Sequence, residues 1–431
     1  MIQILKSKDA GGLLARKAAR LTEAEAVVAP ILEAVRKRGD AAALEYARRF
    51  DGFKGKRLRV PESVLLERRQ RLPVEFVSAV ATAAENVYDY AARQMPVEWM
   101  RELSPGRRLG QIVRPLETVA AYIPGGRYPL PSTVLMTVIP AQVAGVPNIC
   151  IASPRRTDEV FGTAQLLGVH NAFEMGGAHA IAAFAFGTAT VPKADRIVGP
   201  GDIYVAAAKK LLAGEVGIDF IAGPTEIVII AAEGDARILA GDMLAQAEHD
   251  VDASAILLTT SKKLAAAVAS AVSEQLAGLS TAEVASQSIA RNSAIILVET
   301  LEQAVELANR FAPEHLSIPD EKLLGKVRHA GSVFVGPFSP EAAGDYASGP
   351  NHVLPTSGAA RQRGGLSVND FLKVISVQHL DEGALRRLAS AITTLARAEG
   401  LEAHARSVEM RMEGGKQASA RVRAPRRGGR A

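Results

Sequence analysis

Cysteine is nearly absent from this chain of 431 residues, since Cys150 is the only one. A single thiol excludes an internal disulfide and a zinc site built from several cysteines, so any metal would need nitrogen and oxygen ligands. The chain also lacks an unbroken apolar run of about 20 residues, the length that a membrane helix requires. Its N-terminus does not have the pattern of a secretory signal. We expect a cytoplasmic protein without a membrane-spanning segment.

The dinucleotide-binding pattern GxGxxG is missing too, so no nucleotide cofactor can be inferred from that fingerprint. Three glycine–proline turns are present instead, in segments 122–129, 198–202 and 221–226, each after a short apolar run. Glycine lets backbone approach a ligand without a Cβ clash, and doubly wound sheets bind ligands beyond the carboxyl ends of their strands. These turns are compatible with a ligand cleft and equally with tight strand–helix connections.

Acidic residues are absent from the end of the chain. After Glu413 there are six basic residues and no acid, which exceeds the whole net charge of +5, so the rest of the chain is close to neutral. A Gly- and Arg-rich end of this kind is typical of a disordered tail. We therefore expect no nucleic-acid-binding face. An RNA-binding scaffold that depends on the tail is kept as a minor alternative.

The order of apolar patterns predicts the fold class. Helical patterns at 22–39, 40–49 and 74–94 precede two series in which short apolar runs alternate with helical segments, as in parallel sheets covered by helices. From Ser367 the pattern is helical throughout. We predict an α/β fold, with two Rossmann-like parallel-sheet units and helical N- and C-terminal extensions. The predicted parts are an N-terminal arm (1–20), a discontinuous first Rossmann-like domain (21–120 and 226–365), a second Rossmann-like domain (121–225), a C-terminal helical dimerisation region (366–413) and a disordered basic tail (414–431).

Two pairs of polar residues stand out. Gln246 and His249 are spaced i, i+3, which on a helix places both side chains on one face, where they could bind one cation or simply face solvent. Glu314 and His315 are adjacent and follow Pro313, which ends the preceding helix. A carboxylate beside an imidazole offers two proton carriers with different ordinary pKa values, although an exposed pair at a helix end is equally consistent with the sequence.

The segment 338–357 is long, irregular and rich in groups that can do chemistry. Asp345 and His352 lie within it, and its glycines and prolines forbid an ordinary helix. We expect a loop over an active site, with a packed surface loop as the plain alternative. Asp345 and His404 complete a set with Gln246 and His249 whose nitrogen and oxygen donors suit Zn²⁺ or Mn²⁺, although no spacing proves that the four residues meet.

Eight motifs occur in order and resemble the histidinol dehydrogenase family over roughly residues 20–412: AYIPGG, GGAHAIAA, GPG, AGPTE, QAEHD, APEHL, GDYASGPNHVLPTSG and EGLEAH. The resemblance implies a homodimeric, zinc- and NAD-dependent enzyme that oxidises L-histidinol through L-histidinal to L-histidine. It implies one Zn²⁺ per subunit and an active site shared between two chains.

The same resemblance assigns roles to individual residues. The zinc ligands would be Gln246, His249, Asp345 and, from the partner chain, His404. His315 would take protons during alcohol oxidation, and Glu314 would activate the water that attacks the aldehyde. The substrate contacts would be the four ligands together with Thr225, His315, His352 and Glu399, and the cofactor contacts would be Tyr122, His179 and Asp202.

Three positions depart from the pattern of the family. His179 replaces a glutamine, Asp202 replaces an asparagine, and Thr225 replaces a serine while keeping the hydroxyl. The first two lie on the cofactor side. An alternative is therefore a paralogous zinc-dependent NAD dehydrogenase for another small polar alcohol, such as a sulfonated propanediol. A metal hydrolase using the same zinc is a further alternative, which would act without nicotinamide.

Overall fold

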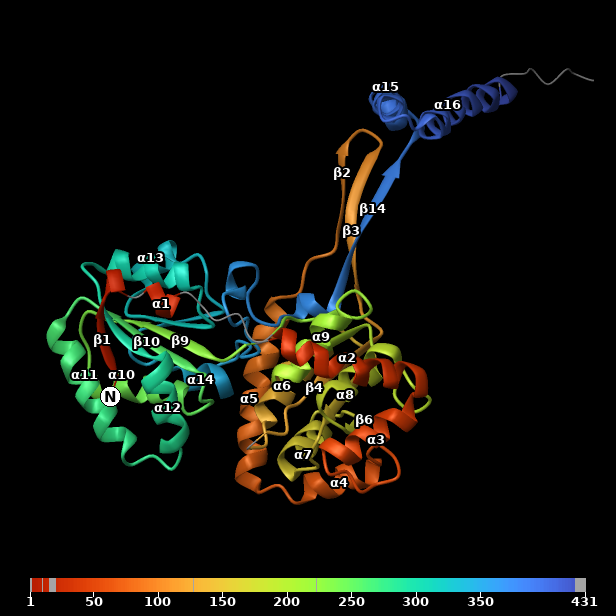
Figure 1. Ribbon diagram of the computed structural model, residues 1–431. Coiled ribbons are helices and arrows are strands. Elements are labelled where there is room, and N and C mark those ends of the chain that lie inside the picture. The colour runs from red at the N-terminus through yellow and green to blue at the C-terminus, as the bar shows by residue number, and fades with distance from the viewer. Residues whose placement is uncertain (1, 10, 15–20, 127, 222, 423–431) are drawn as a thin grey trace, which may run out of the picture. The chain divides into compact units, whose positions relative to one another are not determined.

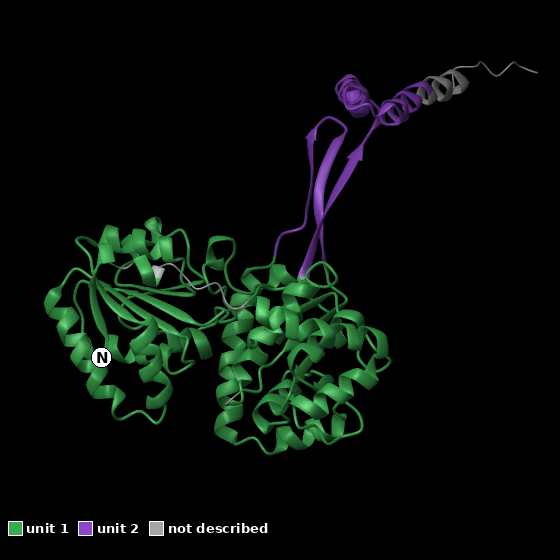
Figure 2. Ribbon diagram, in the orientation of Figure 1, with its two compact units in different colours: residues 1–95, 115–371 green, residues 96–114, 372–431 purple. Residues whose placement is uncertain are grey.

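The structure is a computed structural model that describes residues 2–9, 11–14, 21–126, 128–221 and 223–422. Contacts divide the chain into two units (Figure 2): unit 1 comprises Met1–Met95 and Pro115–Phe371, and unit 2 comprises Pro96–Arg114 and Leu372–Ala431. Within the described residues, none of the helices has the length and apolar character needed to cross a membrane.

Sheet A of unit 1 has six strands, and every pair of neighbours is parallel. Alternate residues of the central strands point into two hydrophobic cores, one on each face. Helix α13 (Leu301–Phe311) covers one face, and α10 (Ala236–Ala247), α11 (Lys262–Leu276) and α12 (Ala282–Asn292) cover the other (Figure 1). In spatial order the strands are β1 (Gln3–Lys6), β11 (Ala294–Leu297), β10 (Ser254–Thr259), β9 (Glu226–Ile230), β12 (His315–Ile318) and β13 (Ser332–Val335).

Sheet B of unit 1 has five parallel strands. In spatial order they are β6 (Asn171–Glu174), β5 (Asn148–Ser153), β4 (Thr118–Tyr122), β7 (Arg196–Val198) and β8 (Gly217–Ile218). The connecting helices are α6 (Pro131–Val143), α7 (Asp158–Leu166), α8 (Gly177–Phe186) and α9 (Ile203–Leu212). The prediction of a parallel α/β fold with two Rossmann-like sheets is confirmed.

Both sheets follow one plan. If the added edge strand β1 is set aside, each sheet has its first strand in the middle, the next two on one side and the last two on the other. This order results when right-handed strand–helix–strand connections place the second and third strands on one side of the first strand and the last two strands on its other side. Such a sheet provides a crevice beside its first strand, where neighbouring connections leave on opposite faces.

The N-terminal helices pack on sheet B or on the helices that cover it. These are α2 (Leu21–Arg38), α3 (Asp40–Phe50), α4 (Glu62–Gln70) and α5 (Val74–Arg93). Pro30 lies inside α2 without ending it. Buried residues of α2 and α3 share one core with the strands of sheet B, which differs from the predicted division that groups 21–120 with 226–365. Residues 3–6, predicted as part of an arm, form strand β1 and pair with β11.

The remaining short elements of unit 1 are α1 (Gly11–Leu14), α14 (Glu341–Tyr346) and four 3-10 turns at Ser7–Asp9, Glu321–Lys326, Ala359–Arg361 and Val368–Phe371. The expectation that glycine excludes a helix from segment 338–357 is wrong at α14. Gly344 lies inside this helix, where a Cβ atom would come within 2.7 Å of the Phe334 ring. The glycine therefore permits close packing of α14 on strand β13.

Unit 2 combines a three-stranded sheet with two helices: β2 (Trp99–Ser104), β3 (Arg107–Pro115), β14 (Leu372–Leu380), α15 (Glu382–Ala398) and α16 (Glu402–Val422). The prediction that the chain is all-helical from Ser367 is wrong, because β14 forms a strand rich in β-branched residues. Helix α16 extends past Glu413, where the disordered tail was predicted to begin. The rest of that tail, residues 423–431, and residues 1, 10 and 15–20 of the predicted arm lie outside the described residues.

Candidate active site

A cluster of polar side chains, most of them buried or half-buried, lies at the amino ends of strands β9 and β12 in sheet A. We call it the proton cluster, and it consists of Thr225, Gln246, His249, Glu314, His315, Glu341 and Asp345. Glu226 and His315 are the first residues of their strands, and His315 pairs with Ile227 on one side and Ser332 on the other. Strand pairing on both sides fixes the backbone that carries the imidazole, so this side chain has a rigid support.

A chain of hydrogen bonds orients Gln246 at the end of α10. Its side chain is fully buried, and its Nε2 donates to Thr225 Oγ1 at 2.8 Å. Thr225 Oγ1 in turn donates to Glu314 Oε2, which also accepts from the Glu226 N–H at 3.0 Å. This direction of donation leaves Gln246 Oε1 buried without a hydrogen-bond partner among the described residues. A buried amide oxygen without a donor is costly, and a cation is one group that would satisfy it.

The carboxylates and the exposed imidazole form a second part of the cluster. One ligand atom each from His249, Glu341 and Asp345 lies within 4.8 Å of the other two. Burial raises the pKa of Asp345 to about 6, because the charged form loses solvation. Nitrogen and carboxylate oxygen donors fit Zn²⁺ or Mn²⁺, and a divalent cation would offset the crowded negative charge. Glu341 was not identified from the sequence; its i, i+4 spacing from Asp345 was the available signal.

His315 is held as a neutral base. Its Nδ1 lies 3.3 Å from the Glu226 carbonyl oxygen, and its Nε2 has no partner within the described part of the chain. The ring lies 5.9 Å from that of Phe334, centroid to centroid. Burial lowers the pKa of His315 to about 3. At neutral pH the imidazole therefore carries one hydrogen and can accept another.

Glu314 is the second proton carrier. Burial raises the pKa of Glu314 well above its usual range, and the negative charges of Glu226 and Asp345 act in the same direction. The backbone around Glu314 is tightly packed. Ala312, two residues before it, has a φ of 52°, and a Cβ atom at Gly331 would lie 2.6 Å from the Glu314 carbonyl oxygen. The adjacent pair predicted from APEHL is thus buried, and the interpretation as an exposed pair at a helix end is wrong.

Asp345 and His352 lie close together in the segment predicted to cover a site. His352 Nδ1 is 2.6 Å from the Asp345 carbonyl oxygen, so Nδ1 carries the hydrogen and Nε2 remains an acceptor. Burial lowers the pKa of His352. Both residues line a narrow pocket with His315 and Phe334. The loop is fixed from behind, because Asn86 donates to Ala347 O at 2.8 Å and Asn351 to Met136 O at 2.6 Å.

The three residues predicted to contact a cofactor lie at the carboxyl edge of sheet B. Tyr122 ends β4, and its hydroxyl accepts from the Gly177 N–H at 3.1 Å. His179 is buried in α8, with Nε2 2.9 Å from Asp51 Oδ2, and Asp51 also accepts from the Gly176 N–H. Asp202 is the N-cap of α9 and accepts from two backbone N–H groups at 3.0 Å. Asparagine could cap this helix in the same way.

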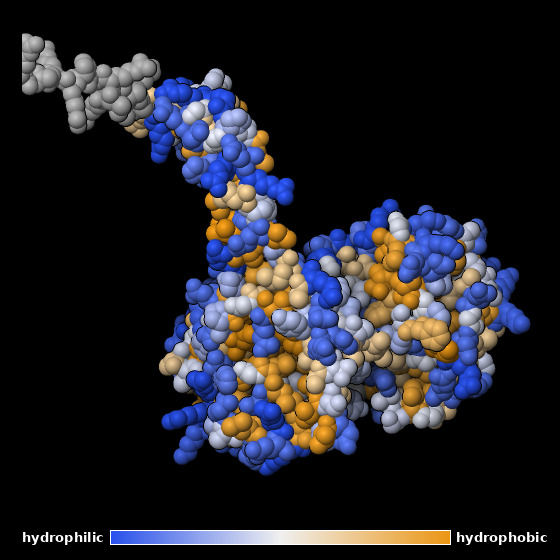
Figure 3. All heavy atoms as spheres, turned by 180° about the vertical axis from the view of Figure 1, so that it is seen from behind, coloured by the Kyte–Doolittle hydropathy of each residue, from blue (hydrophilic) through white to orange (hydrophobic). Residues whose placement is uncertain are grey.

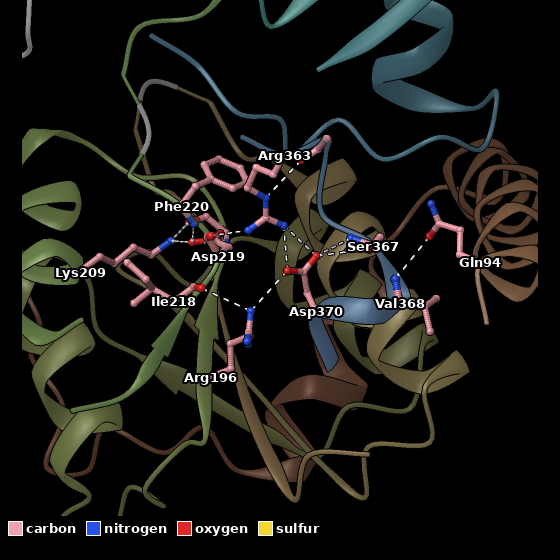
Figure 4. Close-up of polar contacts among 12 residues, drawn as sticks. Gln94, Arg196, Lys209, Ile218, Asp219, Phe220, Arg363, Ser367, Val368 and Asp370 are labelled. Atoms are coloured by element: carbon pink, nitrogen blue, oxygen red, sulfur yellow. Dashed lines mark hydrogen bonds and ion pairs between the residues drawn. The ribbon is translucent and has the colours of Figure 1, made fainter. Parts of the chain in front are cut away.

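A buried ion pair fixes the glycine turn after β7. Lys209 Nζ lies 2.7 Å from Asp219 Oδ1, while Asp219 Oδ2 accepts from the Gly199 N–H at 2.7 Å (Figure 4). Gly199 has a φ of 106°, and a Cβ atom there would lie 2.2 Å from the Tyr122 carbonyl oxygen. Arg363 donates to the Asp219 carbonyl and pairs with Asp370 at 2.8 Å. The loop that faces the end of β4 is therefore braced from several directions.

Not every predicted residue belongs to the proton cluster. The structure brings together Thr225, Gln246, His249, Glu314, His315 and Asp345, with His352 beside them. Residues 223–225 belong to the turn that was predicted to follow a strand, and in the structure they instead lead into the start of β9. Glu399 and His404 belong to unit 2, where Glu399 is the C-cap of α15 and both residues are exposed. In unit 2, residues 399–404 thus mark the junction of α15 and α16.

The chain matches the family model described as histidinol dehydrogenase over residues 14–412. It is 48% identical over 403 residues to the histidinol dehydrogenase of Geobacillus kaustophilus, covering 91% of this chain and 95% of the relative. The Thermus thermophilus relative of the same name is 49% identical, with 90% and 94% covered. A crystal structure of histidinol dehydrogenase from Elizabethkingia anophelis has a TM-score of 0.91 at 35% identity, covering 96% of this chain and 99% of that one. These relatives give no support to another alcohol substrate.

Proposed function

Because the chain belongs to the histidinol dehydrogenase family, we propose that the proton cluster of sheet A is where its reaction takes place. The protein is an NAD-dependent oxidoreductase of histidine biosynthesis, which oxidises L-histidinol through L-histidinal to L-histidine. The enzymes of this family contain zinc. The observation that carries the proposal is the buried pair Glu314–His315 beside a set of donors that fits a metal. Two oxidations at one carbon need both a base for the alcohol and a base for water.

Gln246, His249 and Asp345 hold the zinc ion in this proposal. Support comes from the unpartnered Gln246 Oε1 in the described part of the chain and from the spacing of the His249 and Asp345 ligand atoms. The bound ion supplies a positive charge that holds and polarises polar groups of the substrate. The fourth ligand is His404 of a second copy of the chain, with one ion per subunit.

His315 and Glu314 move the protons. In the first oxidation His315 Nε2 takes the hydroxyl proton, and bound NAD⁺ would supply the acceptor for the hydride of the carbinol carbon. In the second, Glu314 accepts a proton from the water that adds to the aldehyde, and another NAD⁺ would accept the hydride of the hydrate. Each NAD⁺ takes two electrons, which accounts for the four that separate alcohol from acid. A buried carboxyl group with a raised pKa can hold and return a proton near neutral pH.

The substrate is held by the same cluster and its neighbours. Thr225 is oriented by Glu314 and Gln246, and His352 presents Nε2 as an acceptor from the wall of the narrow pocket. Together with Glu399, these residues contact the amino alcohol and its imidazole alongside the metal ligands. NAD binds at the carboxyl edge of sheet B near Tyr122, His179 and Asp202, where glycine turns let the backbone approach a ligand without a Cβ clash. His179 acts there through the Asp51 pair that fixes the start of α8.

Unit 2 forms the interface of a homodimer in this proposal, and the protein acts in the cytoplasm. Hydrophobic residues lie exposed on its strands (Figure 3), including Leu103 and Val374 at 51% and 53% exposure, and Val97, just before β2, is 74% exposed. Apolar strand residues that cover no core of their own chain are typical of surfaces buried between subunits. Such an interface would bring the partner's His404 to the proton cluster.

Complementation between two inactive variants tests both the residue roles and the shared site. His315→Asn and His404→Asn should each be inactive as homodimers. After unfolding and mixing, random hybrids have one intact site in half of the dimers, so roughly a quarter of wild-type NADH formation should return. No recovery, with hybrids present by mass spectrometry, would contradict a ligand from the partner. Full activity of His315→Asn alone would contradict the proposed base.

A further inference from the structure

Glu341 has no role in the reaction as described so far, yet it lies inside the proton cluster. It is the first residue of α14, and its side chain is only 4% exposed. A glutamate is almost never buried to this extent without a partner that needs it. The position is also tightly built, since Gly344 of the same helix packs against the Phe334 ring. A carboxylate held there on a rigid element points to a function within the cluster.

The contacts of Glu341 are made with the imidazole of His315. Glu341 Oε1 lies 3.4 Å from His315 Nδ1, and the Glu226 carbonyl oxygen lies 3.3 Å from the same nitrogen. A third oxygen, Glu314 Oε2, lies 3.7 Å from this nitrogen, so Nδ1 faces oxygen atoms of Glu341, Glu226 and Glu314. On the other side of the ring, Nε2 has no partner among the described residues and lies 3.8 Å from Asp345 Oδ1. Acceptors on one nitrogen alone select the tautomer that carries its hydrogen there.

We propose that Glu341 is a positioning residue for His315: it shares the Nδ1 hydrogen with the Glu226 carbonyl and keeps Nε2 bare toward Asp345 and the narrow pocket. The inference deepens the proposed function and rests on His315 being the base. A base works only if the nitrogen that faces the substrate is the unprotonated one. If Glu341 is lost, the Glu226 carbonyl oxygen at 3.3 Å remains as an acceptor for the Nδ1 hydrogen, whereas Glu314 Oε2 at 3.7 Å lies beyond hydrogen-bond range. One acceptor restrains the ring less than two, so the ring can then turn or change tautomer.

The competing role for Glu341 is that of a metal ligand, since one of its oxygens lies within 4.8 Å of donors from His249 and Asp345. The two roles predict different losses. A positioning residue affects the turnover of bound substrate, whereas a ligand affects the affinity for zinc. Gln246, His249 and Asp345 provide a metal set without it, which is why we assign Glu341 to the imidazole.

The experiment compares Glu341→Ala, Glu341→Gln and the matched control Asp242→Asn in the zinc-loaded enzyme. Asp242 belongs to α10, and its negative charge contributes to the raised pKa of Glu341. Glu341→Ala should lower kcat for both L-histidinol and L-histidinal by about 10²-fold, with little change in KM. Glu341→Gln keeps an oxygen acceptor and should retain most of the activity. Asp242→Asn should stay within about threefold of wild type, as for a distant charge.

Two further readouts separate positioning from a merely structural role. Zinc affinity, measured by competition with a chromogenic chelator, should be unchanged in Glu341→Ala. Added formate should restore kcat of Glu341→Ala in a dose-dependent way, because it can occupy the vacated space and accept the Nδ1 hydrogen. Loss of zinc together with kcat would overturn the proposal in favour of a metal ligand, and full activity of Glu341→Ala would overturn it outright. His315→Asn in the same assay separates this failure from failure of the proposed base, since that variant would then be active too.

Discussion

Apart from the added strand β1, sheets A and B have the same strand order, but their candidate sites lie at opposite ends of the strands. In sheet B the predicted cofactor residues follow the carboxyl ends of β4, β6 and β7, where parallel sheets ordinarily bind ligands. In sheet A the proton cluster lies at the amino ends of β9 and β12. The backbone there presents the Glu226 N–H to Glu314 and the Glu226 carbonyl to His315. In the proposed function, one topology thus serves a cofactor at the carboxyl ends of its strands in sheet B and acid–base chemistry at the amino ends in sheet A.

The proton cluster should give the largest response to substitution. His315→Asn removes the base and should lower kcat for L-histidinol by about 10³-fold or more, at the upper end for loss of a general base. Glu314→Gln should affect L-histidinal oxidation more than alcohol oxidation, because only the second step needs an activated water. Separate measurement of NADH from the alcohol and from the aldehyde checks this split. Equal losses in both steps for Glu314→Gln would contradict the assigned roles.

The sequence predicted much of the scaffold and part of this cluster. The helix predicted at 74–94 has the bounds Val74–Arg93 in the structure, because its apolar spacing is regular over several turns. Strand β12 was missed because it has only four residues directly after a helix stop. Glu341 was missed because glycine in segment 338–357 argued against the short helix that carries it. That Gln246 and Glu314 share Thr225 depends on long-range contacts, which no local pattern encodes.

The metal side of sheet A gives the next largest effect. Gln246→Ala removes the buried oxygen that has no partner within the described residues, and we expect zinc affinity to fall by about 10²-fold, as is typical when a metal site is disturbed. Competition with a chelator measures it. His179→Gln, in helix α8 beyond the carboxyl end of β6 in sheet B, is the control and should leave zinc affinity unchanged. Loss of zinc from the control alone would place the metal at sheet B and break the comparison.

Substitutions near the predicted cofactor residues of sheet B should change KM for NAD⁺. Gly199→Ala places a Cβ atom 2.2 Å from the Tyr122 carbonyl oxygen, so the turn must move away from the end of β4. We expect KM for NAD⁺ to rise about tenfold, a displacement cost of roughly 1.4 kcal/mol, with zinc affinity intact. Gly145→Ala is the matched control: its φ of 81° is also left-handed, but nothing lies within 4 Å of its added Cβ. An equal rise of KM in both variants would show that strain alone is responsible.

The smallest effect concerns stability without metal. The folded pKa of Asp345, about 6, exceeds its ordinary value of 3.8, so the folded chain binds a proton that the unfolded chain does not bind between these values. Metal-free protein should therefore gain stability as pH falls through about 6, and lose it as pH rises. Calorimetry at pH 7.5 and 5.0 should show a smaller gap in Tm between zinc-loaded and metal-free protein at the lower pH. Asp345→Asn should weaken that dependence without removing it, because the buried Glu314 and Glu341 carboxyl groups also have raised pKa values.

The location of the zinc ion tests the central claim most directly. Anomalous diffraction at the zinc absorption edge, from crystals of the zinc-loaded protein, gives that position independently of activity. The account predicts one peak per chain at the amino edge of sheet A, about 2.0–2.2 Å from Gln246 Oε1, an imidazole nitrogen of His249 and a carboxylate oxygen of Asp345. A peak at the carboxyl edge of sheet B, or one without Gln246 among its ligands, would contradict it.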